Sequence, residues 1–218
     1  MSAAHDYTRL AEFCLEVKRE AEALRWSEEG LWVFEDGRPD ERLLFLAVRL
    51  LRGQGKHADA AVHLWRALAK APSLEIYRLL RGMEGEAGRD RALAQLSQAL
   101  SKAGNSSWHS PDDLLVRIFM EEQDFAAAWT LARRHRISMS LESELARVSE
   151  ATHPGEAIRV HAAAVERLAA SGGTPAYAEA KELIARVARL QGRDEHRSYL
   201  AGVKERHARK RNFMKLLA

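Results

Sequence analysis

The chain has 218 residues, 46% of them hydrophobic and 30% charged, a balance typical of a folded globular protein that excludes a disordered one. No apolar run approaches the ~20 residues that a membrane-spanning helix needs, and no secretory-signal pattern opens the chain, so we expect a cytoplasmic protein without a membrane partner. The formal net charge is +3, but residues 204–215 alone carry +5, which leaves a nearly neutral body and a basic C-terminal segment.

Apolar residues recur every three or four positions along the chain, and no stretch alternates with the period of a β-strand. Glycine and proline interrupt this pattern, which predicts helices that pair as hairpins. The first hairpins are expected over 6–34 (helices 6–18 and 20–34), over Glu41–Pro72, and over 73–100, where glycines 82, 85 and 88 separate the two helices. The later hairpins pair 114–119 with 125–132, 141–148 with 157–168, and 177–190 with 194–217.

Capping residues mark several helix ends. Asp40 is expected to cap the start of one helix, and Gly37 to cap the end of the helix before it. Ser73 is expected to cap the next helix in the same way. The clearest helix start is the segment 110–113, because it combines a capping serine, a proline at the first helical position and two aspartates at the positive end of the helix dipole.

A small residue opens the second helix of each hairpin at a nearly regular interval. These residues are Ala23, Ala60, Ala92, Ala128 and Ala157, with Ser198 as a weaker sixth. The steps between the first five are 37, 32, 36 and 29 residues, close to the ~34 of tetratricopeptide repeats. Two helices approach to ~8–10 Å only where nothing bulky separates them, so small residues are needed there. We therefore predict an all-α, tetratricopeptide-like solenoid of about six helical hairpins, forming a single helical-repeat domain over residues 1–218; the alternative is an irregular helical bundle.

Three segments resemble a known family. Residues Tyr7–Phe34, Ala71–Tyr77 and the more specific Arg209–Leu217 are similar to blocks of the helical region that follows the zinc finger in bacterial SWIM zinc-finger proteins. The finger's cysteines and histidine are absent here, so the resemblance implies no zinc-binding residue. It implies a bacterial cytoplasmic protein that is associated with uncharacterised, nucleic-acid-linked proteins. The chain would be either a stand-alone relative or the C-terminal portion of a longer chain.

The sequence holds no recognised pattern for catalysis, metal binding or a cofactor. Its nine histidines lack ligand spacing, and His161 is expected to be a core histidine. The single cysteine, Cys14, excludes an intramolecular disulfide and is expected to be an inert thiol on a buried face with Phe13 and Val17. The five tryptophans are expected in the core, apart from Trp108 in a loop. We expect no enzyme, no metal and no cofactor.

Two functions from different classes remain. The first is a scaffold for protein–protein interaction, in which the first helices of the repeats line a concave face that holds a protein or peptide. The polar residues expected on that face suggest an acidic ligand, although ordinary solvated surface would look the same; they are Arg42, Arg49, Arg78, Arg81, Arg117 and Glu121.

The alternative function is nucleic-acid binding through the basic C-terminal helix, whose cations would neutralise phosphates. The residues concerned are Lys204, Arg206, Arg209, Lys210 and Arg211. A competing interpretation is that this helix only covers the end of the solenoid, because Phe213, Leu216 and Leu217 form an apolar face that would dock on the preceding hairpin. The partner's identity and the oligomeric state stay open.

Overall fold

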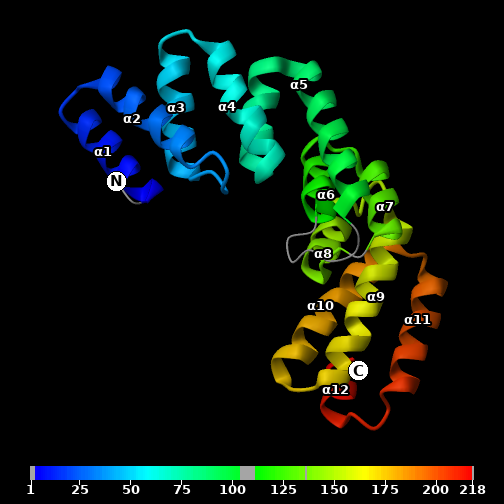
Figure 1. Cartoon of the computed structure of the whole chain (residues 1–218). Helices are drawn as coiled ribbons and strands as arrows, with labels where there is room; N and C mark the ends of the chain where they lie inside the picture. The colour runs from blue at the N-terminus through cyan, green and yellow to red at the C-terminus, as the bar shows by residue number, and fades with distance from the viewer. Residues whose placement is uncertain (1–2, 104–110, 136, 218) are drawn as a thin grey trace. The chain divides into compact units, whose positions relative to one another are not determined.

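The computed structural model describes residues 3–103, 111–135 and 137–217, and over these ranges it contains twelve α-helices and no strand (Figure 1). The prediction of an all-α protein is therefore confirmed. The chain divides into two compact units, Met1–Ile118 and Phe119–Ala218. That the whole chain is one domain stays a prediction. Within the described ranges, every helix is too short or too polar to cross a bilayer.

The helices follow one another with short connections. The first six are α1 (Ala4–Glu16), α2 (Glu20–Val33), α3 (Glu41–Gly53), α4 (His57–Lys70), α5 (Leu74–Ala103) and α6 (Pro111–Glu121). The other six are α7 (Phe125–Arg134), α8 (Met139–Val148), α9 (Pro154–Ser171), α10 (Thr174–Leu190), α11 (Arg193–Arg206) and α12 (Arg211–Leu216).

Two of the predicted helix starts are capped as expected. The Asp40 carboxylate accepts a hydrogen bond of 3.0 Å from the Leu43 N–H, and the Ser73 hydroxyl accepts one of 3.3 Å from the Ile76 N–H. The helix predicted from the segment 110–113 begins at Pro111. Gly37 is not the C-terminal cap of α2, because that helix already ends at Val33.

In the first unit, each helix packs on the next from α1 to α5, and α1 also contacts α3, so that the second hairpin stacks on the first. The closest approach is at Gly30 of α2. A Cβ atom placed there would lie 2.6 Å from Leu43 of α3 and 2.7 Å from the Cβ of Tyr7 on α1. Glycine is therefore the residue that lets three helices meet at this point.

The small residues predicted to open each second helix lie in the core. Five of them are fully buried, with 0% of their surface exposed: Ala23, Ala60, Ala92, Ala128 and Ala157. The weaker sixth, Ser198, is exposed, so the pattern does not extend to α11. Burial of the five alanines fits close helix pairing.

Helix α5 changes direction at one of the three glycines expected to interrupt it. Gly85 has a φ of 64° and a ψ of −141°, a conformation that is open essentially to glycine alone. Gly82 and Gly88 lie within helical turns, so they do not separate two helices as predicted. Trp65 of α4 fixes the bend, because its indole N–H donates to Glu84 at 2.9 Å and Arg91 lies 4.1 Å above its ring.

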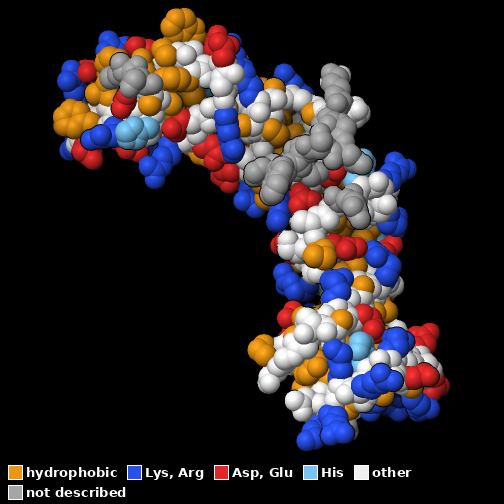
Figure 2. All heavy atoms as spheres, turned by 60° about the horizontal axis from the view of Figure 1, so that its bottom comes forward, with side chains coloured by type: hydrophobic (Ala, Val, Ile, Leu, Met, Phe, Trp, Pro, Cys, Tyr) orange, Lys and Arg blue, Asp and Glu red, His pale blue; other side chains and the backbone are white. Residues whose placement is uncertain are grey.

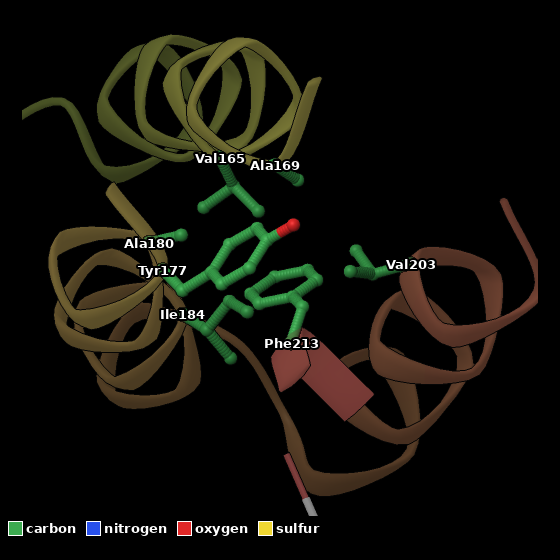
Figure 3. Close-up of a cluster of buried hydrophobic side chains, with 7 residues drawn as sticks. All are labelled: Val165, Ala169, Tyr177, Ala180, Ile184, Val203 and Phe213. Atoms are coloured by element: carbon green, nitrogen blue, oxygen red, sulfur yellow. The ribbon is translucent and has the colours of Figure 1, made fainter. Parts of the chain in front are cut away.

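The second unit is built around α9 and α10, which lie side by side, with α8 on α9 and with α11 and α12 against α10 (Figure 1). Residues from α9 to α12 form one hydrophobic cluster: Val165, Ala169, Tyr177, Ala180, Ile184, Val203 and Phe213 (Figure 3). The rings of Tyr177 and Phe213 are stacked at 5.0 Å, so the short C-terminal helix is anchored by its own aromatic residue.

The prediction of one continuous helix over 194–217 is wrong. The chain turns after Arg206, and α12 starts again at Arg211. The turn lets Phe213 reach the cluster, and Lys210 holds it by donating a hydrogen bond of 2.9 Å to the carbonyl of Ala170 at the end of α9. Docking of the apolar C-terminal residues on the preceding hairpin is confirmed, since Phe213 is buried and Leu216 and Leu217 pack against the same cluster.

Some apolar residues lie outside the core, against expectation. Cys14 is buried, but Phe13 and Val17 beside it are exposed, because α2 and α3 cover only the opposite side of α1. Trp65 and Trp129 are buried as predicted, whereas Trp32 is 69% exposed. Trp108 lies outside the described residues. Figure 2 shows hydrophobic side chains at the surface of the face that it displays.

Candidate functional site

The second unit contains a trough formed by α8, α9 and α10, with a volume of about 550 Å³. Helix α9 contacts both neighbours and supplies the central stripe, which contains His161, Ala164, Leu168 and Ser171 at intervals of three and four residues. Helices α8 and α10 supply the two sides. The volume lies within the range of roughly 300–1,000 Å³ that is typical of ligand-binding pockets.

Two residues that line the trough, His161 and Arg186, share a partly buried polar contact with Glu150, which follows α8. The Glu150 carboxylate is 3.0 Å from Nε2 of His161 and accepts a second hydrogen bond, of 3.1 Å, from Arg186. His161 is 3% exposed, which confirms the prediction of a core histidine. Burial raises the pKa of Glu150, but hydrogen bonds and charge attraction from His161 and Arg186 outweigh it and lower the pKa overall. The carboxylate thus stays ionised and links α9 to α10.

Four charged side chains around the trough are exposed and have no hydrogen-bond or ion-pair partner among the described residues. They are Arg147 on α8, Arg167 on α9, and Glu179 and Glu182 on α10. The free cations therefore lie on α8 and α9, and the free carboxylates on α10. Exposed charges of this kind stay hydrated and carry no desolvation penalty, and they are available to pair with a ligand. On the face that Figure 2 displays, by contrast, acidic and basic side chains are intermingled.

An ion-pair network joins α8 and α9 outside the lining of the trough. Arg159 of α9 pairs with Glu142 of α8 at 3.0 Å and with Glu156 at 3.2 Å, and Glu156 also accepts a hydrogen bond from Arg133 of α7. Burial raises the pKa of Glu156, but the hydrogen bonds from the two arginines outweigh it and lower the pKa overall. These ion pairs therefore support the two helices that carry Arg147 and Arg167.

A buried hydrogen-bond chain adds to that support. The Trp129 indole N–H of α7 donates to the Ser149 hydroxyl at 3.0 Å, and this hydroxyl donates to the Leu145 carbonyl at 2.7 Å. Because each polar atom in this chain is satisfied, α7 and the end of α8 are joined without a cost in unpaired groups.

The six residues predicted to bind a protein partner lie on α3, α5 and α6, not around the trough. Arg42 and Arg49 on α3 are exposed, as are Arg117 and Glu121 on α6. On α5, Arg78 lies 3.6 Å from Glu75, and the half-buried Arg81 pairs with Glu86 at 2.5 Å. The structure groups these residues in pairs on single helices. Their role in binding stays a prediction.

Two of the five residues predicted to bind nucleic acid are used within the chain. Arg206 donates to Glu166 of α9 at 2.8 Å, and Lys210 donates to the Ala170 carbonyl. The other three have no hydrogen-bond or ion-pair partner among the described residues: Lys204 is half-buried, and Arg209 and Arg211 are exposed. Nucleic-acid binding stays a prediction that rests mainly on these three.

Glu166 makes the docking of the C-terminal helices depend on pH. Burial raises its pKa, but hydrogen bonds from Arg206 and His207, the latter at 2.9 Å, outweigh it and lower the pKa from the ordinary 4.5. The folded state therefore binds this proton more weakly than the unfolded state, and the stabilisation exists above about pH 4.5 and is lost as the pH falls through the folded-state pKa.

We expect Glu166→Gln to reduce the free energy of unfolding at neutral pH. We also expect the stability of this variant to fall less steeply on acidification than that of the unmodified chain. Urea unfolding measured between about pH 6 and pH 3 checks this, with the exposed Glu205→Gln as the control. An acid dependence in Glu166→Gln as steep as in the unmodified chain would show that this carboxylate is not the group responsible.

Sequence reasoning did not find the trough. Its charged residues recur at helical spacing on exposed faces, and the same pattern is typical of ordinary solvated surface. The only signal was His161, a polar residue at a position that should face its own hairpin. That signal identified a buried histidine but not the helices that surround it.

Two further observations concern metal binding and the comparison of the chain with known proteins. No group of three or more His, Cys, Asp or Glu side chains within the described ranges is placed to hold a metal ion. Neither the protein-family models nor the curated proteins give a match to the chain. The resemblance to the helical region of SWIM zinc-finger proteins therefore stays an expectation.

Proposed function

We propose that the chain is a non-catalytic protein of the helical-hairpin repeat type, with tetratricopeptide-like pairing, and that the trough of the second unit binds a segment of a protein partner. The observation that carries the proposal is a trough of about 550 Å³ in which His161 and Arg186 are paired with Glu150, while four charges around it have no partner among the described residues. Consecutive helix contacts and the fully buried alanines support the repeat pairing.

The chemistry of the trough favours binding over catalysis. His161 is held by Glu150, and the lowered pKa of Glu150 makes this carboxylate a weak base at neutral pH. A general base works best when its pKa lies near the working pH, and a nucleophile needs an adjacent base that is free to take its proton. Neither arrangement is present around His161.

The placement of the free charges indicates the form of the partner segment. An extended peptide points successive side chains to opposite sides, so residues of alternating charge present one sign to each side of the trough. Acidic side chains would pair with Arg147 and Arg167, and basic ones with Glu179 and Glu182. An extended segment with acidic and basic residues in alternation is therefore the ligand that the trough fits.

Charge reversal on the basic side tests the proposal. We expect Arg147→Glu combined with Arg167→Glu to weaken binding by at least about tenfold, because like charges would then face each other across the interface. The measurement is capture of a discrete partner from host lysate, followed by titration of that partner. Arg189→Glu with Arg193→Glu is the matched control, since both arginines are exposed, lie in the same unit and do not line the trough.

Nuclease treatment of the lysate separates the two function classes. A protein captured equally with and without nuclease, and lost in the trough variant, supports the proposal. Equal capture by the trough variant and the control variant contradicts it. Capture that disappears with nuclease would favour the nucleic-acid function and direct attention to Lys204, Arg209 and Arg211.

A further inference from the structure

The first unit has a second, smaller cavity of about 90 Å³ between α2 and α4, bounded also by Leu44 of α3 and by the connection from α2 to α3. Half of its lining is apolar: Leu31, Trp32, Phe34, Pro39, Leu44 and Ala67. The volume is several times the roughly 10–15 Å³ that one water molecule needs, so the cavity has room for a side chain.

Trp32 is the feature of this cavity that packing within the chain does not account for. Its residue surface is 69% exposed, whereas the indoles of Trp65 and Trp129 are buried and donate hydrogen bonds to Glu84 and Ser149. Tryptophan is among the residues most enriched at the centres of protein interfaces, where a large ring contributes contact area at little entropic cost.

The charges at the rim indicate what approaches the cavity. Arg66 and Lys70 are four residues apart on α4, both exposed and without a partner among the described residues. On α2, Glu28 already faces His63 at 3.7 Å. Glu35, which follows α2, is then the only lining carboxylate without a partner among the described residues. The free charges at the rim are thus predominantly positive.

We propose that this cavity binds one bulky aliphatic side chain of a partner peptide, and that carboxylates on the residues beside it pair with Arg66 and Lys70. The apolar lining takes the side chain, the Trp32 ring covers it, and the two cations select an acidic sequence around it. This surface belongs to the first unit and does not depend on the trough.

Blocked tripeptides test the proposal on the full chain. The probes are acetyl-Glu-Leu-Glu-amide, acetyl-Lys-Leu-Lys-amide and acetyl-Glu-Ala-Glu-amide, and the readout is the indole N–H signal of Trp32 in two-dimensional NMR, assigned through Trp32→Phe. We expect the acidic leucine peptide to shift this signal in a saturable way. The lysine and alanine peptides should bind at least about tenfold more weakly, because each lacks one of the two recognised features.

Two double variants complete the experiment. Arg66→Glu with Lys70→Glu should remove the response, whereas Arg52→Glu with Lys56→Glu should keep it, since these exposed cations do not line the cavity. Unchanged Trp65 and Trp129 signals show that each variant is folded. The proposal is overturned if the Trp32 signal does not move, if the lysine peptide binds as well as the acidic one, or if Arg66→Glu with Lys70→Glu responds like the unmodified chain.

Discussion

Phe213→Ala is expected to destabilise the second unit by about 3–5 kcal/mol, the range measured for removing a large aromatic side chain from a core. Phe213 is 0% exposed, stacks on Tyr177 at 5.0 Å and meets the His207 ring edge-on at 5.9 Å. Helix α12 has only six residues, too few to be helical without tertiary contacts. Losing its anchor therefore releases the helix and exposes the cluster it covers (Figure 3).

Hydrogen exchange of the α10 amides measures this effect locally, because it reports the opening of one unit without requiring the chain to unfold as a whole. Met139→Ala is the control, since Met139 is a large exposed side chain in the same unit. Faster exchange throughout α10 in Phe213→Ala but not in Met139→Ala is the expected outcome. Equal exchange in the two variants would show that α12 contributes little to the fold.

The same variant helps to interpret the basic C-terminal segment. Arg206 and Lys210 contribute to docking through Glu166 and Ala170, so their loss would lower stability whether or not nucleic acid binds. Arg209 and Arg211 carry no such contact among the described residues. A loss of nucleic-acid affinity on replacing these two arginines is therefore a binding effect. A loss of affinity that Phe213→Ala also causes is structural.

The sequence was sufficient to predict most of the helices and most of the core. Ala60 and Ala92 could be placed at the helix contacts because apolar periodicity and the position of small side chains can be recognised within one or two helical turns of sequence. The turn after Arg206 could not be predicted, since residues 204–215 contain no glycine or proline and favour a helix locally. It is set by contacts of Lys210 and Phe213 with α9 and α10, which are distant in sequence.

The trough could not be predicted for a related reason. Arg147, Arg167 and Glu182 are exposed residues on amphipathic helices, and nothing local distinguishes them from solvated surface. They come together around one trough only because α9 contacts both α8 and α10, a pairing that depends on the fold. Trp32 shows the converse, since an aromatic residue that local pattern assigns to the core lies at the surface.

Gly30→Ala is expected to destabilise the first unit by about 1–3 kcal/mol, although alanine is the better helix former by about 1 kcal/mol. The new Cβ would lie 2.6 Å from a Leu43 methyl group, which can rotate away, but also 2.7 Å from the Cβ of Tyr7, which moves only with the backbone of α1. Helix α1 must therefore shift away from α2, and the burial of Tyr7 and Ala11 is reduced.

Gly82→Ala provides the matched control for this prediction, because it makes the same chemical change in α5 at a position where a Cβ meets nothing within 4 Å. We expect it to stabilise the chain by about 0.5–1 kcal/mol, the ordinary gain from replacing glycine in a helix. Thermal unfolding followed by circular dichroism compares the two variants. A loss of stability in Gly30→Ala together with a gain in Gly82→Ala would show that close helix packing outweighs helix propensity at Gly30. A gain of stability in both variants would mean that α1 is not held at this distance from α2 and α3.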